Sequence, residues 1–201
     1  MAEAFLLDTV RLIPSADPPH RTSPGASAQD RLRMVRLALE SAGDHLVADG
    51  SELERVGKSY MVDTLKALRE ENPSESISLI LGTDAFIELM TWYEWQQLFT
   101  LAHIIVASRP NLPISQLKNK LKGELFAEFE QRNSRDYNTI SSSTHGLIYT
   151  YEFTSLEVSG TSLRKRIQNG LSLKYLLPDN VINYIQDYSL YEESRSESNT
   201  E

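Results

Sequence analysis

The sequence contains no cysteine among its 201 residues. This absence excludes disulfide bonds, catalysis by a thiolate and zinc sites with cysteine ligands. The sequence also lacks any apolar run that approaches the roughly 20 residues needed to span a bilayer. Its first eight residues do not form the basic and apolar regions of a signal peptide. We therefore expect a cytoplasmic protein that does not enter a membrane.

Positive charge is also scarce, because the sequence has 20 Lys and Arg residues but 28 Asp and Glu residues, which gives a net charge of -8. This balance argues against non-specific binding of nucleic acid, which needs a basic surface. A phosphate ligand is still allowed, since a few local donors can bind it. The composition is otherwise that of an ordinary globular protein, with 40% hydrophobic and 24% charged residues. The chain is long enough for one domain with a substantial core.

Short apolar runs alternate with amphipathic segments, which predicts an α/β fold with a Rossmann-like parallel sheet, flanking helices and a small C-terminal helical part. Strands are predicted at residues 10–13, 45–49, 76–81, 103–107 and 149–153. Helices are predicted at residues 28–42, 60–70, 85–90, 95–100, 162–169 and 178–188. Residues 116–132 are predicted as one charged helix that a Ser/Thr-rich loop follows. We expect one domain over residues 1–188 and a disordered acidic tail over residues 189–201.

The strongest local signal for a ligand is the segment Val158-Ser159-Gly160-Thr161-Ser162-Leu163-Arg164. Ser159 or Thr161 can cap the start of a helix, and Gly170 can end it. The free N–H groups and the dipole at a helix start favour an anion. Arg164 lies one turn further on and can fold back onto the same anion. The alternative is a plain capped helix on the surface.

A second signal is Leu81-Gly82-Thr83-Asp84, where a buried strand ends in glycine and a carboxylate follows. Open α/β sheets bind ligands at the carboxyl ends of their strands. Asp84 can therefore hold a ribose hydroxyl, or it can cap the next helix.

A third signal is Thr91-Trp92-Tyr93-Glu94-Trp95, which holds the only two tryptophans of the chain. Such a cluster can stack on a flat heteroaromatic ring, and it can equally be core packing.

The fourth signal is the rigid turn Pro18-Pro19-His20-Arg21, which can present His20 and Arg21 to a phosphate after a strand. The other histidines, His45, His103 and His145, are interpreted as structural or solvated. No His, Asp or Glu cluster has the spacing of metal ligands, so no metal site on the protein is predicted.

In this order and spacing, the segments resemble the bacterial nicotinate-nucleotide adenylyltransferases. The resemblance runs from about Leu12 to Tyr191 and is weakest between Asn111 and Phe153. Other stretches that match are Ile13-Pro14, Glu52-Leu53 to Ser59-Tyr60, Thr64-Leu65, Ala102-His103 to Arg109-Pro110, and Tyr175-Leu176-Leu177-Pro178.

The resemblance implies an enzyme of NAD biosynthesis that joins nicotinate mononucleotide to the adenylyl group of ATP, with Mg²⁺ carried mainly by ATP. Trp92 would stack on the nicotinate ring, and backbone groups near Tyr60 and Tyr93 would receive its carboxylate. Asp84 would line the mononucleotide site at the strand end. The residues implied at ATP and its phosphates are His20, Arg21, Gly82, Ser159, Thr161 and Arg164.

The sequence departs from the family at its start, where the family has a strand and the loop GGTFDPxHxGH. Residues Met1 to Phe5 resemble the helix that follows this loop, so no catalytic residue is assigned here. We expect a start codon assigned too far downstream, or else a truncated paralogue. We also expect the 201 residues alone to have little activity. The alternatives are a related nucleotidyltransferase, for phosphopantetheine or nicotinamide mononucleotide, and an inactive module that binds a mononucleotide.

Overall fold

The computed structural model describes residues 2–17, 25–153 and 158–192. They form two compact units, one from Met1–Asp8 with Ser59–Leu156 and one from Thr9–Lys58 with Glu157–Glu201. Every strand pairing in both units is parallel, and helices accompany the strands. The predicted α/β class is confirmed. The predicted single domain over residues 1–188 stays a prediction.

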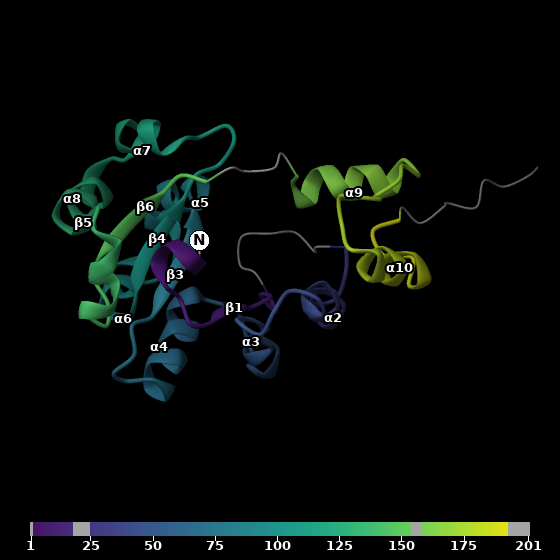
Figure 1. Ribbon diagram of the computed structural model, residues 1–201, viewed down its shortest axis with the longest axis horizontal. Coiled ribbons are helices and arrows are strands. Elements are labelled where there is room, and N and C mark those ends of the chain that lie inside the picture. The colour runs from purple at the N-terminus through teal and green to yellow at the C-terminus, as the bar shows by residue number, and fades with distance from the viewer. Residues whose placement is uncertain (1, 18–24, 154–157, 193–201) are drawn as a thin grey trace, which may run out of the picture. The chain divides into compact units, whose positions relative to one another are not determined.

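The first unit is built on a four-stranded sheet with the order β3-β4-β6-β5 (Figure 1). Its strands are β3 (Ser78–Gly82), β4 (His103–Ala107), β6 (Ile148–Tyr151) and β5 (Asn133–Ser134). In the register, Gly82 pairs with Ala107, and Ala107 pairs with Tyr151. The carboxyl ends of three strands therefore lie together at one edge of the sheet.

Alternate residues of these strands point to opposite faces of the sheet, as the pleat requires. Leu81 and Val106 belong to the large core, whereas Ile105 and Tyr149 belong to a smaller cluster with Phe5. The elements around the sheet are α1 (Ala2–Phe5), α4 (Met61–Glu71), α5 (Thr83–Ile87), η1 (Leu89–Thr91), η2 (Trp95–Gln97), α6 (Leu98–Leu101), α7 (Ile114–Lys120), α8 (Gly123–Arg132) and η3 (Tyr137–Ser142).

The prediction of one helix over residues 116–132 is wrong, because the segment forms two helices, α7 and α8. The backbone is extended at Leu121 and Lys122, and Gly123 has a φ of 55°. Glycine tolerates this left-handed conformation without the steric cost of a Cβ. The break places Leu121 in the large core next to residues from both helices. The expected loop that follows contains β5 and η3, which the sequence did not indicate.

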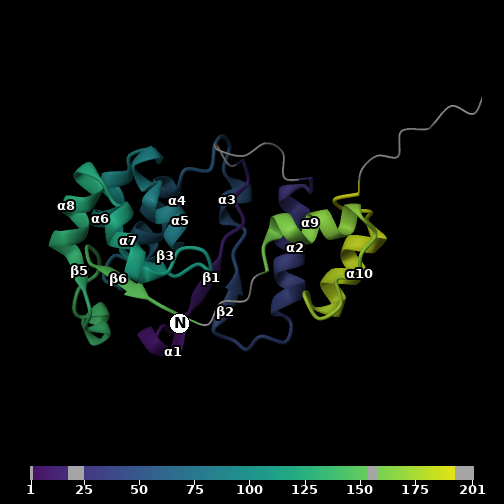
Figure 2. The same cartoon turned by 90° about the horizontal axis from the view of Figure 1, so that it is seen from above.

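The second unit has a two-stranded parallel sheet of β1 (Val10–Leu12) and β2 (Leu46–Ala48). Its helices are α2 (Ala28–Leu39), α3 (Ser51–Glu54), α9 (Gly160–Gln168) and α10 (Asp179–Asp187). Leu37 of α2 packs with Val181 and Ile185 of α10, and Leu163 of α9 joins this cluster. Figure 2 shows these three helices side by side. The predicted small C-terminal helical part is therefore confirmed. Helix α3 was not predicted from the sequence.

Within the described ranges, no helix combines the length and apolar character needed to cross a membrane. Part of the predicted acidic tail, residues 193–201, lies outside the described residues.

Candidate active site

The carboxyl edge of the four-stranded sheet brings Gly82, Asp84 and Arg109 together. Gly82 ends β3 and caps α5, so Asp84 lies in the first turn of that helix. Arg109 follows the end of β4, and its Nε donates to Oδ1 of Asp84 at 3.2 Å. Both side chains are largely exposed, at 56% for Arg109 and 64% for Asp84. The pair therefore stands in solvent, where open α/β sheets bind their ligands.

Asp84 remains ionised at neutral pH in this setting. Partial burial raises the pKa of Asp84, but the backbone N–H of Ala85 and the guanidinium of Arg109 lower it by more. The pKa of Asp84 therefore lies below its ordinary value of 3.8. An ionised carboxylate is a strong acceptor for two hydroxyl donors at once.

Gly82 makes room for this ion pair. A Cβ at position 82 would lie 2.5 Å from Nε of Arg109 and would also overlap the carboxylate of Asp84. Contacts this close do not occur between real atoms, so a larger residue would push the pair apart. The functional reason for glycine here is close approach of side chains, because its φ of -71° is open to any residue.

The aromatic stretch divides into a buried and an accessible half. Trp95 is 8% exposed and its ring lies 6.1 Å from that of Phe99, so it is core packing. Trp92 is partly buried at the border of the same core. The rings of Tyr60 and Tyr93 lie 4.6 Å apart. Trp92 and Tyr93 are thus the members of the stretch that can meet a ligand, and Tyr60 lies beside Tyr93.

A charged pair fixes the turn that follows Tyr93. Glu94 has a φ of 51°, in the left-handed region, and its carboxylate lies 3.1 Å from Nζ of Lys66. The hydrogen bond from Lys66 lowers the pKa of Glu94, and the charge of Glu94 raises the pKa of the Tyr93 hydroxyl. Lys66 was not predicted from the sequence. It lies on α4, 28 residues before Glu94.

The predicted phosphate residues Ser159, Thr161 and Arg164 lie on the first turns of α9, in the second unit. Ser159 is the N-cap, as expected, and its side chain accepts from the backbone N–H of Ser162 at 3.1 Å. Arg164 donates to Oγ1 of Thr161 at 3.4 Å, so its guanidinium folds back toward the helix start. Gly170 ends the helix with a φ of 64°, also as expected.

Two predicted phosphate residues, His20 and Arg21, lie outside the described residues. Of the other histidines, His103 is fully buried and hydrogen-bonded, whereas His45 and His145 are exposed. Their interpretation as structural or solvated residues is confirmed.

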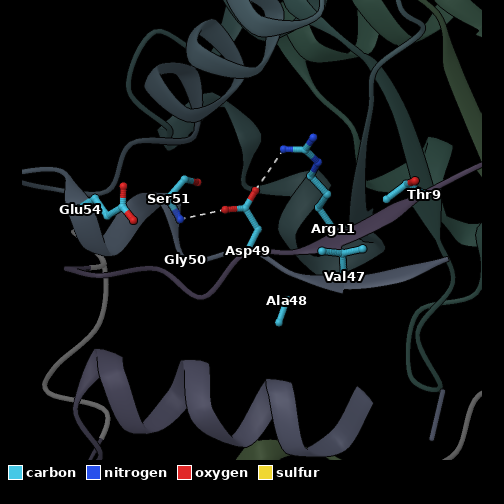
Figure 3. Close-up of a pocket in the computed structure, with 8 residues that line it drawn as sticks. All are labelled: Thr9, Arg11, Val47, Ala48, Asp49, Gly50, Ser51 and Glu54. Atoms are coloured by element: carbon cyan, nitrogen blue, oxygen red, sulfur yellow. Dashed lines mark hydrogen bonds and ion pairs between the residues drawn. The ribbon is translucent and has the colours of Figure 1, made fainter. Parts of the chain in front are cut away.

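The second unit contains a cavity of about 440 Å³ that was not predicted from the sequence (Figure 3). Asp49, one of the residues that line it, accepts hydrogen bonds from Arg11 at 3.4 Å and from the backbone N–H of Ser51 at 2.8 Å. The cavity is lined by Thr9, Arg11, Val47, Ala48, Asp49, Gly50, Ser51 and Glu54. The pattern Asp49-Gly50-Ser51, an acidic residue before a short helix, was the available signal.

In the part of the chain that the structure describes, no group of three His, Asp or Glu residues could hold a metal ion.

Residues 1–166 match a family model described as cytidylyltransferase-like. The chain is therefore a nucleotidyltransferase of the cytidylyltransferase-like class. Its relatives include the probable nicotinate-nucleotide adenylyltransferase of Dechloromonas aromatica, 44% identical over 94% of this chain and 86% of the relative. That of Methylococcus capsulatus is 42% identical over 94% of this chain and 88% of the relative. The chain belongs to the nicotinate-nucleotide adenylyltransferase family.

Solved structures agree at the level of the fold. The chain is similar to the nicotinic acid mononucleotide adenylyltransferase of Plasmodium falciparum complexed with NaAD, with a TM-score of 0.66 and 16% identity. The match covers 94% of this chain and 90% of that one. The roles of individual residues in this chain remain predictions.

Proposed function

We propose that this chain transfers the adenylyl group of ATP to nicotinate mononucleotide and so forms deamido-NAD and pyrophosphate. The observation that carries the proposal is its similarity, over 94% of its length, to proteins named as nicotinate-nucleotide adenylyltransferases. The site geometry supports it, since a carboxylate and accessible aromatic rings lie in one compact unit. We also propose a cytoplasmic location, where ATP is available.

The reaction requires no covalent intermediate on the protein. A phosphate oxygen of the mononucleotide attacks the α-phosphorus of ATP and forms a new P–O bond. The bond from the α-phosphorus to its bridging oxygen breaks, and that electron pair leaves with pyrophosphate. Placing the two substrates in line and neutralising the growing charge is the main catalytic task.

The acceptor would be held by residues of the first unit. Trp92 would stack on the pyridine ring, and backbone N–H groups near Tyr60 and Tyr93 would bind the carboxylate. Asp84 would accept hydrogen bonds from ribose hydroxyls, and Gly82 would line the adjoining ATP site. These assignments fit the exposure of Asp84 and Tyr93 and the partial exposure of Trp92.

The phosphates of ATP would be held by residues of the second unit. Ser159 and Thr161 lie at the start of α9, where the helix dipole favours an anion. Arg164 folds back over the same turn and would bind pyrophosphate oxygens. His20 and Arg21 are proposed for the same ligand on the sequence alone. Mg²⁺ would enter with ATP and neutralise the charge of its phosphates.

A turnover assay with several acceptors tests the proposal. The protein is supplied with ATP, Mg²⁺ and one of three acceptors: nicotinate mononucleotide, nicotinamide mononucleotide or phosphopantetheine. We expect equal amounts of deamido-NAD and pyrophosphate, with nicotinate mononucleotide as the best acceptor. Turnover of another acceptor in preference would assign the chain to a different nucleotidyltransferase. Tight binding of the mononucleotide without pyrophosphate release would identify a non-catalytic binding module.

A further inference from the structure

The guanidinium of Arg109 is held at Asp84 by two short links between strand ends. Arg109 and Leu112 exchange backbone hydrogen bonds of 3.3 and 2.9 Å, which close a tight turn after β4. The hydroxyl of Thr83, fully buried, donates to the carbonyl oxygen of Leu112 at 3.0 Å. Thr83 is the residue before Asp84. The turn that carries Arg109 is therefore fixed to the helix start that carries Asp84.

The pair uses only part of its hydrogen-bonding capacity. Among the described residues, the Arg109 side chain donates from Nε to Oδ1 of Asp84. A carboxylate has room for about four hydrogen bonds over its two oxygens. The backbone N–H of Ala85 and the guanidinium of Arg109 fill part of this capacity, and the side chain, 64% exposed, is open to further donors.

We propose that Arg109 is a positioning residue, which fixes Oδ1 of Asp84 so that the exposed carboxylate is oriented to accept hydrogen bonds from the ribose hydroxyls of the bound mononucleotide. The inference rests on the proposed function, in which Asp84 contacts this substrate. The inference adds Arg109 to the site, as the residue that keeps the Asp84 carboxylate ionised and correctly oriented.

The chemistry of arginine suits this role better than that of lysine. Its guanidinium is planar and its Nε–H has a fixed direction, whereas an ammonium group is a freely rotating point charge. The pair is also too exposed to contribute much to folding, since water screens exposed ion pairs. Loss of Arg109 should therefore change ligand binding more than stability.

A double-mutant cycle on Asp84 and Arg109 tests the inference. The binding of nicotinate mononucleotide is measured by calorimetry for the unaltered protein, Asp84→Asn, Arg109→Gln and the double variant. We expect Arg109→Gln to weaken binding by about tenfold with a nearly unchanged Tm, and Arg109→Lys to recover part of the loss. Because Arg109 acts through Asp84, the double variant should bind no more weakly than Asp84→Asn alone.

The pH dependence of binding gives a second readout. Removing the guanidinium removes one cause of the lowered pKa of Asp84. In Arg109→Gln, the acid limb of the binding curve should therefore move to higher pH, and in Arg109→Lys it should stay closer to its original place. A merely structural role would leave this limb unmoved.

The possible failures are distinguishable. If the unaltered protein does not bind nicotinate mononucleotide, the proposed function fails. If it binds and Asp84→Asn weakens binding, but Arg109→Gln has no effect or adds fully to Asp84→Asn, the inference about Arg109 is wrong.

Discussion

The backbone N–H of Leu147 donates a hydrogen bond to Nδ1 of His103, 44 residues earlier in the chain, at 3.1 Å. Nδ1 can accept only when it carries no proton. Nε2 lies 3.0 Å from the carbonyl oxygen of Ser143 and must therefore be the protonated nitrogen. The fully buried imidazole joins the start of β4 to the segment before β6 in its neutral form.

This arrangement predicts acid sensitivity of the first unit. Burial lowers the pKa of His103 below its ordinary value of 6.5; the hydrogen bond to Ser143 opposes this, and the charges of His145 and Arg69 add to it. The unfolded chain then binds a proton that the folded chain resists. The stability contributed by neutral His103 is complete above about pH 6.5 and is lost as the pH falls toward the folded pKa, by at most about 1.4 kcal/mol per pH unit.

Chemical unfolding between pH 8 and 5 measures this effect. His103→Gln should be less stable at pH 8 but should have a shallower dependence on pH below 6.5. His45→Gln, at an exposed position, is the matched control and should keep the original slope. If His103→Gln keeps the full slope, the acid sensitivity has another source.

The sequence was most informative where local pattern and burial agree. Residues 103–107 were predicted as a strand and form β4, because all five are buried on both faces of a parallel sheet. The pattern failed between α7 and α8, where the charged residues favour a continuous helix. There the burial of Leu121 and the left-handed Gly123 decide the break, and both depend on tertiary packing.

In the candidate site, too, features set by the local sequence were predictable and those set by tertiary packing were not. Asp84 was predictable, since a carboxylate after a strand and a glycine is a local signal. Arg109 was not, because its place beside Asp84 depends on the bond between Thr83 and Leu112, 29 residues apart. The capped start of α9 at Ser159 was also predictable, since the cap is formed by a residue three positions away.

Arg164→Ala should raise the ATP concentration needed for half-maximal turnover and leave mononucleotide binding nearly unchanged. A guanidinium that folds over a helix start can bind phosphate oxygens, and hydrogen bonds to charged groups contribute about 1.5–3 kcal/mol. We therefore expect at least a tenfold rise, about 1.4 kcal/mol. Lys165→Ala, the exposed neighbour on the same helix, is the control. Equal effects of the two variants would indicate general electrostatics instead of a specific contact.

Gly82→Ala should weaken mononucleotide binding with little change in Tm. Its backbone conformation suits alanine, but the new Cβ would displace the exposed side chains of Asp84 and Arg109. Gly170→Ala should behave in the opposite way, because a left-handed position costs alanine about 1 kcal/mol of stability and lies at the end of α9. Calorimetry and thermal unfolding of both variants would check this reversal. Normal binding by Gly82→Ala would show that the pair can move without loss.

Trp92→Ala should weaken nicotinate mononucleotide by at least about tenfold and ATP far less. Stacking of aromatic rings adds about 0.5–1.5 kcal/mol beyond the area that is buried, and loss of the indole removes both contributions. The carboxylate would be bound separately by backbone donors, so nicotinamide mononucleotide should bind more weakly than the acid even in the unaltered protein. Both ligands can be titrated by following tryptophan fluorescence.

The chain offers a matched control for this experiment, because its only other tryptophan, Trp95, is buried against Phe99. Trp95→Phe should keep both the affinity and the fluorescence change on binding, which Trp92 then reports alone. Trp92→Phe should lose the fluorescence change and retain part of the affinity, since a phenyl ring can still stack. If the signal instead follows Trp95, or if Trp92→Ala binds the mononucleotide normally, Trp92 is core packing and the pyridine ring binds elsewhere.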